Sequence, residues 1–164
     1  MRTFQKAFGQ MVCAVGLLLL LMTACNQPTQ NPPGFSDQDL SALHLIAEQD
    51  SAIVMSRNWD VLAAEYTADA VRMPPNQPAV KGREAIRKWL EQMPPVTNFS
   101  FQLVDLQGGG EFAFMHGRWS ITAAPLGADT VRDSGKILVV LRKQKDGSWL
   151  RVADAWNSDI SPAK

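Results

Sequence analysis

The spacing of apolar residues changes at Pro94 and Pro95, and this change limits the possible folds more than any other feature of the sequence. Before the two prolines, apolar residues recur every three or four positions, which is typical of amphipathic helices. After them, apolar residues partly alternate with polar ones, which is typical of strands. The predicted helices span residues 37–57, 61–66 and 82–92, and the predicted strands span residues 70–73, 96–107, 112–124, 131–143 and 149–156. The sequence therefore predicts an α+β domain, in which three N-terminal helices pack on a curved antiparallel sheet of four to six strands.

The N-terminal segment has the features of an export signal. Arg2 and Lys6 precede a run without charge over residues 11–22, which is shorter than the roughly 20 apolar residues of a membrane-spanning helix. Residues 21–25 (LMTAC) resemble a bacterial lipobox, in which the cysteine is diacylated and becomes the new N-terminus. The alternative is an ordinary cleaved signal peptide with an incidental cysteine.

The lipobox interpretation divides the chain into three parts. Residues 1–24 form a lipoprotein signal peptide, residues 25–35 a flexible tether that starts at the lipidated Cys25, and residues 36–160 the folded domain. We therefore expect an exported protein, lipid-anchored in the bacterial cell envelope on the periplasmic side of a membrane.

Charge and residue counts exclude several classes of function. Sixteen Lys and Arg balance sixteen Asp and Glu, so the chain lacks the basic surface of a nucleic-acid binder. Cys13 falls in the predicted signal and Cys25 is the predicted lipid site, which leaves no free thiol. With two histidines in the chain and no free cysteine, we expect neither a metal site nor a cofactor.

Four segments carry a resemblance to a known superfamily. They are residues 59–76 (WDVLAAEYTADAVRMPPN), 80–86 (VKGREAI), 146–149 (DGSW) and 154–159 (DAWNSD). Together with the order of elements, they resemble the SnoaL-like, ketosteroid-isomerase-like superfamily, in an uncharacterised bacterial lipoprotein branch. The resemblance covers residues 37–159 and implies the nuclear transport factor 2-like (NTF2-like) fold. In that fold the sheet forms a cone around an apolar pocket for a small organic molecule, and a homodimer is common.

The resemblance does not extend to the steroid isomerase machinery. The position of the isomerase base falls on Pro74, and that of the oxyanion-hole tyrosine falls on Asp50. The position of the protonated aspartate falls near Val139 or Leu141. Since all three roles lack their usual side chain, we do not expect steroid isomerisation of that kind.

Two aspartates remain as candidate acids or bases. Asp154 lies on the last predicted strand, where SnoaL-type cyclases are known for an acid/base aspartate, although a buried structural role is the alternative. Asp50 has apolar neighbours on the first helix, and burial in the cone would raise its pKa. The alternative for Asp50 is an acid on the helix surface.

The predicted strand over residues 112–124 has two different faces. Hydrophobicity alone would turn Ala113, Met115, Gly117, Trp119 and Ile121 inward. The alignment with the isomerases instead turns Phe114, His116, Arg118, Ser120 and Thr122 inward, and we prefer this arrangement. It gives His116 a catalytic role, places Arg118 and Phe114 against the ligand, and leaves an apolar outer face for a homodimer.

The remaining candidates are wall residues of the pocket. They are Trp59, Tyr66, Met73, Trp156 and Asn76, the last at the mouth. Packing is the alternative role for the three aromatic residues. The function expected is small-molecule binding, with acid/base chemistry of an isomerase, cyclase or dehydratase as one possibility. A non-catalytic ligand-binding or protein-interaction module and a purely structural domain are the alternatives.

Overall fold

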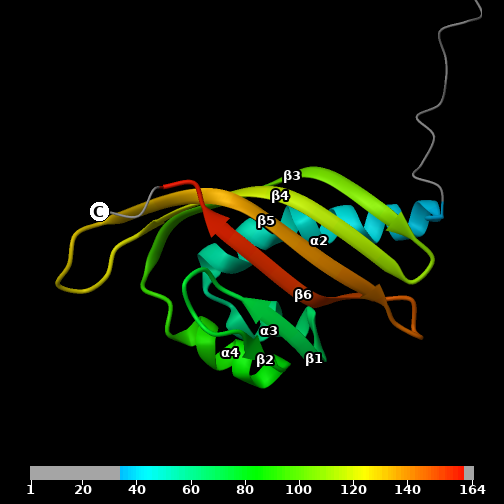
Figure 1. Cartoon of the computed structure of the whole chain (residues 1–164), viewed down its shortest axis with the longest axis horizontal. Coiled ribbons are helices and arrows are strands. Elements are labelled where there is room, and N and C mark those ends of the chain that lie inside the picture. Colours follow the sequence, from blue (N-terminus) through cyan, green and yellow to red (C-terminus); the bar gives the residue numbers. More distant parts are fainter. Residues whose placement is uncertain (1–33, 161–164) are drawn as a thin grey trace, which may run out of the picture. The chain divides into compact units, whose positions relative to one another are not determined.

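The computed structural model describes residues 34–160 (Figure 1). The predicted signal peptide, Cys25 and most of the predicted tether lie outside the described residues. The described part consists of three helices and a six-stranded sheet in the order β2-β1-β6-β5-β4-β3. The predicted α+β class and the packing of the helices on a sheet are confirmed.

The three helices lie close to their predicted positions. They are α2 (Asp37–Ser56), α3 (Trp59–Ala64) and α4 (Arg83–Glu91). Ser36 starts α2 with a capping box, in which its hydroxyl accepts from the backbone N–H of Asp39 and the Asp39 side chain accepts from the Ser36 backbone. The helix ends at Arg57, which adopts a left-handed conformation with φ of 55°.

The strands differ from the prediction at one edge of the sheet. They are β1 (Tyr66–Met73), β2 (Val80–Lys81), β3 (Val96–Gly109), β4 (Phe112–Ala123), β5 (Val131–Lys143) and β6 (Trp149–Ser158). Strand β1 begins at Tyr66, four residues before its predicted start, and β2 was not predicted. Within residues 34–160, β1 pairs with β6 in parallel, and the other neighbouring strands are antiparallel. This parallel pair sets Arg72 opposite Asp154.

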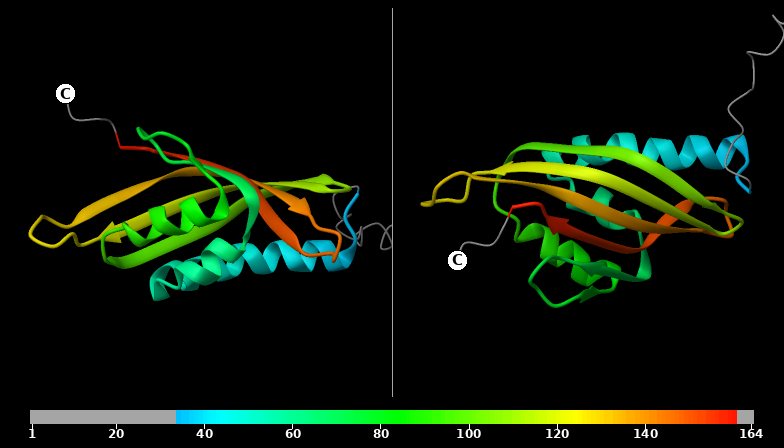
Figure 2. Two further views of the ribbon diagram at one scale, coloured as in Figure 1. Left: turned by 90° about the horizontal axis from the view of Figure 1, so that it is seen from below. Right: turned by 45° about the horizontal axis from the view of Figure 1, so that its top comes forward.

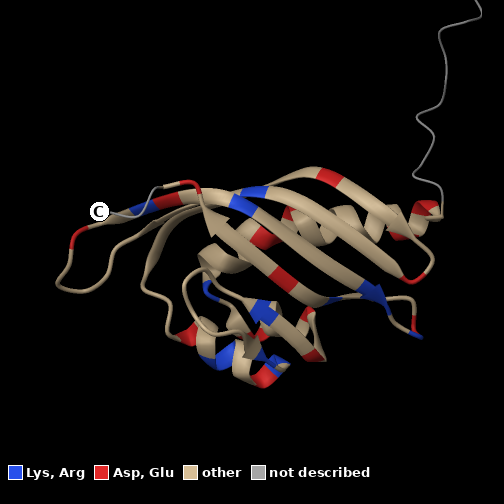
Figure 3. Cartoon of the chain, in the orientation of Figure 1, with Lys and Arg blue, Asp and Glu red and all other residues tan. Residues whose placement is uncertain are grey.

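The helices pack on the same face of the curved sheet (Figure 2). One apolar cluster joins α2 to β4 and β5 through residues such as Leu43, Met115 and Leu141. A second joins α3, α4 and β1 through residues such as Leu62, Ile86 and Leu90. Figure 3 shows acidic and basic positions interspersed over helices and sheet, with no face of a single sign in that view.

A polar contact fixes the start of α2 on the sheet. The indole N–H of Trp149 donates to Asp39 Oδ1 at 2.9 Å, and Lys143 Nζ lies 2.6 Å from the same oxygen. Hydrogen bonds from Lys143, Ser36 and Trp149 lower the pKa of Asp39 below its usual range. The carboxylate that caps α2 therefore also ties the helix to β5 and β6.

Strand β4 has the opposite orientation to the one we preferred from the isomerase alignment. Ala113, Met115 and Trp119 are buried, whereas Phe114 is 45% exposed. His116 and Arg118 are also exposed, so the prediction that Phe114, His116 and Arg118 face the pocket is wrong. Side chains alternate along a strand, so an alignment displaced by one residue exchanges its two faces. Met115 packs in one cluster with Leu43 of α2, so the face of β4 that carries Met115 is the one turned toward the helices.

Candidate functional site: a pocket between the helices and the sheet

A cavity of about 80 Å³ lies between the three helices and the inner face of the sheet. Its apolar walls include Val54, Leu62, Leu90, Met93, Phe99, Phe101, Trp119, Ile121 and Ile137. Four charged side chains also line it: Asp50, Arg72, Arg151 and Asp154. Trp89 and Trp156 complete the lining.

A second, outer chamber of about 500 Å³ adjoins this inner cavity. It is lined by residues that include Pro74, Pro75, Gln77, Gln92, Pro94 and Asp133. Both spaces are lined by Trp89, Met93, Trp119, Ile121 and Trp156. We call these five side chains, which border both spaces, the neck.

Asp154 is the most completely buried charge of the cavity, with a side chain that is 0% exposed. The Tyr66 hydroxyl donates to its Oδ2 at 2.7 Å, and Arg72 Nη1 donates to the same oxygen at 2.9 Å. Arg72 Nη1 also contacts the Tyr66 hydroxyl. Within residues 34–160, the other oxygen, Asp154 Oδ1, has no hydrogen-bond partner.

The Arg72 guanidinium is held by aromatic rings as well as by Asp154. Its central carbon lies 4.5 Å from the ring centroid of Trp156 and 5.0 Å from that of Trp89, within the range of cation–π attraction. Burial lowers the pKa of Arg72, but attraction to Asp154 and Tyr66 outweighs it and the net shift is upward. Burial also raises the pKa of Tyr66 far above its usual value. The tyrosine therefore stays protonated as a donor to Asp154.

A second ion-pair centre also lies close to the Tyr66 ring. Arg151 Nη2 donates to Asp50 Oδ1 at 2.7 Å and lies 2.9 Å from Glu65 Oε2. The guanidinium carbons of Arg72 and Arg151 lie 5.9 and 5.6 Å from the Tyr66 ring centroid. Burial raises the pKa of Glu65, and the nearby Asp50 charge adds to this shift, while Arg151 opposes it. The Tyr66 ring therefore lies close to the arginine of each centre.

The structure brings together only part of the predicted site. Asp50, Asp154 and Trp156 line the inner cavity, and Tyr66 lies behind it with its hydroxyl on Asp154. His116 lies on the opposite face of the sheet from Asp154, because their strand partners Leu138 and Val139 are adjacent residues of β5.

The other predicted wall residues do not line either space. Trp59 is buried in the apolar cluster of α3 and α4, and Met73 is 40% exposed. Asn76 adopts a left-handed backbone conformation with φ of 57°, next to Pro74, Pro75 and Gln77 of the outer chamber. These positions correct the predictions that Trp59 and Met73 contact a ligand in the pocket, whereas the place of Asn76 at the mouth stays a prediction.

Arg72, Arg151 and Glu65 are functional candidates that sequence analysis missed. Strict alternation along the last strand would set Arg151 and Asp154 on opposite faces. The register slips by one residue, so that Val140 pairs with Ala153 but Leu141 pairs with Arg151. This bulge turns both charges inward. For Arg72, the only signal was a basic residue inside a short, otherwise mostly apolar strand segment.

Among residues 34–160, no group of three or more His, Cys, Asp or Glu side chains is placed to hold a metal ion. Over the same residues, no helix has the length and apolar character needed to cross a bilayer.

Comparison with known proteins places this pocket in a family. The sequence profile described as SnoaL-like domain matches residues 47–155, which include Asp50, Arg72, Arg151 and Asp154. The chain belongs to the SnoaL-like domain family. No curated protein matches the sequence.

Solved structures agree on the fold of this SnoaL-like domain. A ketosteroid isomerase-like protein from Erwinia carotovora atroseptica has a TM-score of 0.69 at 18% identity, over 77% of this chain and 100% of that one. An NTF2-like protein with a cystatin-like fold from Novosphingobium aromaticivorans has a TM-score of 0.62 at 14% identity, over 76% and 85%. A Catenulispora acidiphila protein in complex with S-DNPA also has a TM-score of 0.62, at 16% identity, over 76% and 96%. At these identities, the likeness concerns the fold alone.

Proposed function

We propose that the SnoaL-like domain binds a small, mostly apolar organic molecule in the pocket that the inner cavity and the outer chamber form together. The supporting observation is a cavity with largely apolar and aromatic walls, whose charged residues pair with one another and leave space unfilled. Pockets of this composition are typical ligand sites. The complex of the Catenulispora acidiphila protein with S-DNPA supports ligand binding by this fold.

The experiment is mass spectrometry of molecules that co-purify with the full chain. The proposal expects one bound organic species, present in the wild type and weakened or altered in Asp154→Asn. A wild-type protein that carries no molecule and takes up none of a panel of apolar compounds contradicts the proposal.

Acid/base chemistry is the second candidate function, and Asp154 Oδ1 is the observation that favours it. This oxygen is buried at the cavity, while Tyr66 and Arg72 hold the other oxygen. Such an arrangement leaves one carboxylate oxygen available to accept a proton from a bound molecule. His116 takes no part in this proposal, because it lies on the outer face of the sheet.

The same purification separates catalysis from binding alone. If Asp154 transfers protons, Asp154→Asn retains unconverted substrate, which differs from the wild-type molecule in mass or chromatographic retention. The same molecule in both proteins favours a non-catalytic binding module.

We also propose that Cys25 carries a lipid and holds the domain at a membrane of the cell envelope. Within the described residues, Gly34 accepts a hydrogen bond from Gly110 at the β3–β4 turn. The outer chamber is lined by Ala123 and Val131, at the other end of β4 and β5.

A homodimer through the outer face of the sheet is a further proposal. Phe112, Phe114 and Leu138 are 44, 45 and 47% exposed on β4 and β5. Large apolar side chains gathered on one sheet face are typical of an interaction surface. The apolar set expected there, which included Met115 and Trp119, is instead buried under the helices.

A further inference from the structure

The charges that line the inner cavity neutralise one another. Arg72 lies 2.9 Å from Asp154, and Arg151 lies 2.7 Å from Asp50. A charged ligand group would lose its hydration and find no unpaired counter-ion, which is costly in a buried site. Glu65 adds one more carboxylate behind Arg151, which disfavours an anion further. The cavity is therefore suited to an uncharged group.

Some side chains that line the cavity have buried polar atoms without partners. Among residues 34–160, these are the donors Trp119 Nε1, Arg72 Nε and Arg151 Nε and the acceptor Asp154 Oδ1. Trp119 is 9% exposed and lines both the inner cavity and the outer chamber. A Cβ placed at Gly135 would overlap the backbone oxygen of Asn157 and lie 3.1 Å from Trp119 Nε1, so the glycine leaves room for the Asn157 backbone and for the indole. Buried donors rarely remain unpaired, and a ligand that accepts a hydrogen bond would satisfy this one.

The two spaces differ in size. Ligand pockets usually measure roughly 300–1,000 Å³. The outer chamber, at about 500 Å³, lies in this range, whereas the inner cavity of about 80 Å³ holds only a small group of atoms. A molecule that fills both must have a small end and a larger end joined through the neck.

We propose that the pocket selects a neutral molecule of two parts. A small head carrying a hydrogen-bond acceptor, such as a carbonyl oxygen, enters the inner cavity and accepts from Trp119 Nε1–H. An apolar body lies in the outer chamber against the neck. Trp119 is then the residue that determines specificity for the head group. This inference rests on the proposed function, that the pocket binds a small organic molecule.

Four probes with the same naphthalene body test the head group. They are 2-acetylnaphthalene, 2-ethylnaphthalene, 2-naphthoate and 2-naphthylmethylammonium. Dissociation constants are measured on the full chain by ligand-observed NMR. We expect the acetyl probe to bind roughly three- to tenfold more tightly than the ethyl probe, the range of one hydrogen bond, and both ions to bind more weakly than either.

Matched tryptophan variants locate the donor. Trp119→Phe keeps an aromatic ring in the neck but removes the unpaired N–H, so the acetyl-to-ethyl affinity ratio should fall to about one. Trp59→Phe is the control, because Trp59 lines neither space and lies in the apolar cluster of α3 and α4. In that variant the ratio should stay at its wild-type value.

The outcomes separate this inference from the proposed function. Equal affinity for acetyl and ethyl probes, tightest binding by either ion, or an unchanged ratio in Trp119→Phe overturns the inference while ligand binding stands. If none of the four probes binds, the proposed function fails and the inference fails with it. The comparison of the four probes on the wild-type chain tests the inference even if Trp119→Phe does not fold.

Discussion

Removing one partner of the buried ion pair between Arg72 and Asp154 should destabilise the protein far more than removing the arginine of a surface network with more partners. Arg72→Met keeps an unbranched apolar side chain between Trp89 and Trp156 but leaves the Asp154 carboxylate buried without its counter-ion. Removing one partner of a buried pair costs about 3–5 kcal/mol. The two side chains are only 12% and 0% exposed, so solvent cannot replace the lost arginine.

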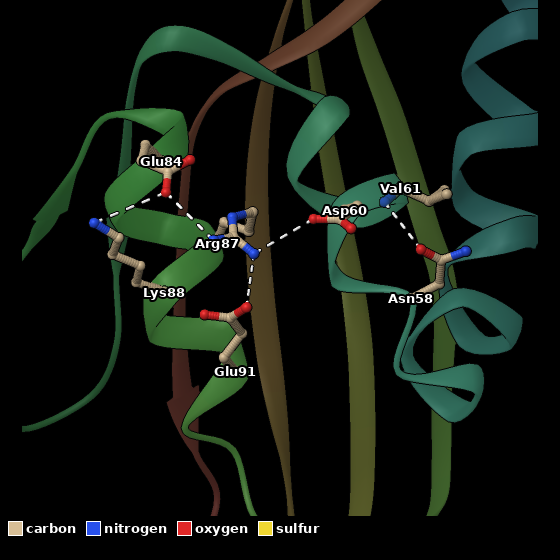
Figure 4. A network of polar contacts seen from close by, with 7 residues as sticks. All are labelled: Asn58, Asp60, Val61, Glu84, Arg87, Lys88 and Glu91. Carbon is tan, nitrogen blue, oxygen red and sulfur yellow. Dashed lines mark hydrogen bonds and ion pairs between the residues drawn. The ribbon is translucent and has the colours of Figure 1, made fainter.

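Arg87 of α4 provides the matched control (Figure 4). It contacts Glu91 at 2.6 Å, Glu84 at 3.4 Å and Asp60 at 3.5 Å, but these acids are 46, 68 and 83% exposed. Exposed pairs contribute about 0–1 kcal/mol each, so Arg87→Met should cost little despite three partners.

The assay is urea unfolding of the full chain followed by tryptophan fluorescence, with the free energy taken from midpoint and slope. Adding Asp154→Asn to Arg72→Met should recover part of the loss, because the carboxamide is uncharged and still accepts from Tyr66. If Arg72→Met lowers the free energy of unfolding no more than Arg87→Met does, Arg72 is not the buried counter-ion of Asp154.

Three further predictions concern pH, the anchor and the outer face. Burial raises the pKa of Glu65 above its usual 4.5, so the folded state holds this proton more tightly than the unfolded chain. The free energy of unfolding, measured by urea titration at several pH values, should therefore fall as pH rises above 4.5. Glu65→Gln should make this decline with pH shallower. The same decline in the variant and the wild type would count against the burial of Glu65. Cys25→Ala should release the protein from membranes into the soluble fraction, and unchanged membrane association would refute lipidation. Phe114→Glu should reduce the mass measured by light scattering from dimer to monomer with the circular dichroism spectrum unchanged, whereas a wild-type monomer would contradict the homodimer.

Much of the fold is predictable because it follows from local patterns. The alternation after Pro95 places β3, β4 and β5 close to their observed ends, and Ser36 with Asp39 marks the start of α2. The orientation of β4 was also readable from hydrophobicity, since the apolar alternate residues are the buried ones. The isomerase alignment misled here, because one residue of displacement exchanges the faces of a strand.

The site is less predictable because it depends on contacts between distant segments. Asp154 is recognisable as a candidate, but its partner Arg72 is 82 residues away and becomes adjacent only through the parallel pairing of β1 and β6. Arg151 needs the bulge in β6 to point inward. A single sequence carries no local signal for either feature.

The most direct test of the account is to map a bound molecule onto the five tryptophans by the NMR signals of their indole N–H groups. Trp89, Trp119 and Trp156 line the neck, whereas Trp59 and Trp149 lie in the apolar clusters. On addition of 2-acetylnaphthalene to the full chain, the three neck signals should shift, and that of Trp119 should shift most. The signals of Trp59 and Trp149 should stay unchanged. Shifts of Trp59 or Trp149 without the neck signals, or no shift at all, would contradict ligand binding in this pocket.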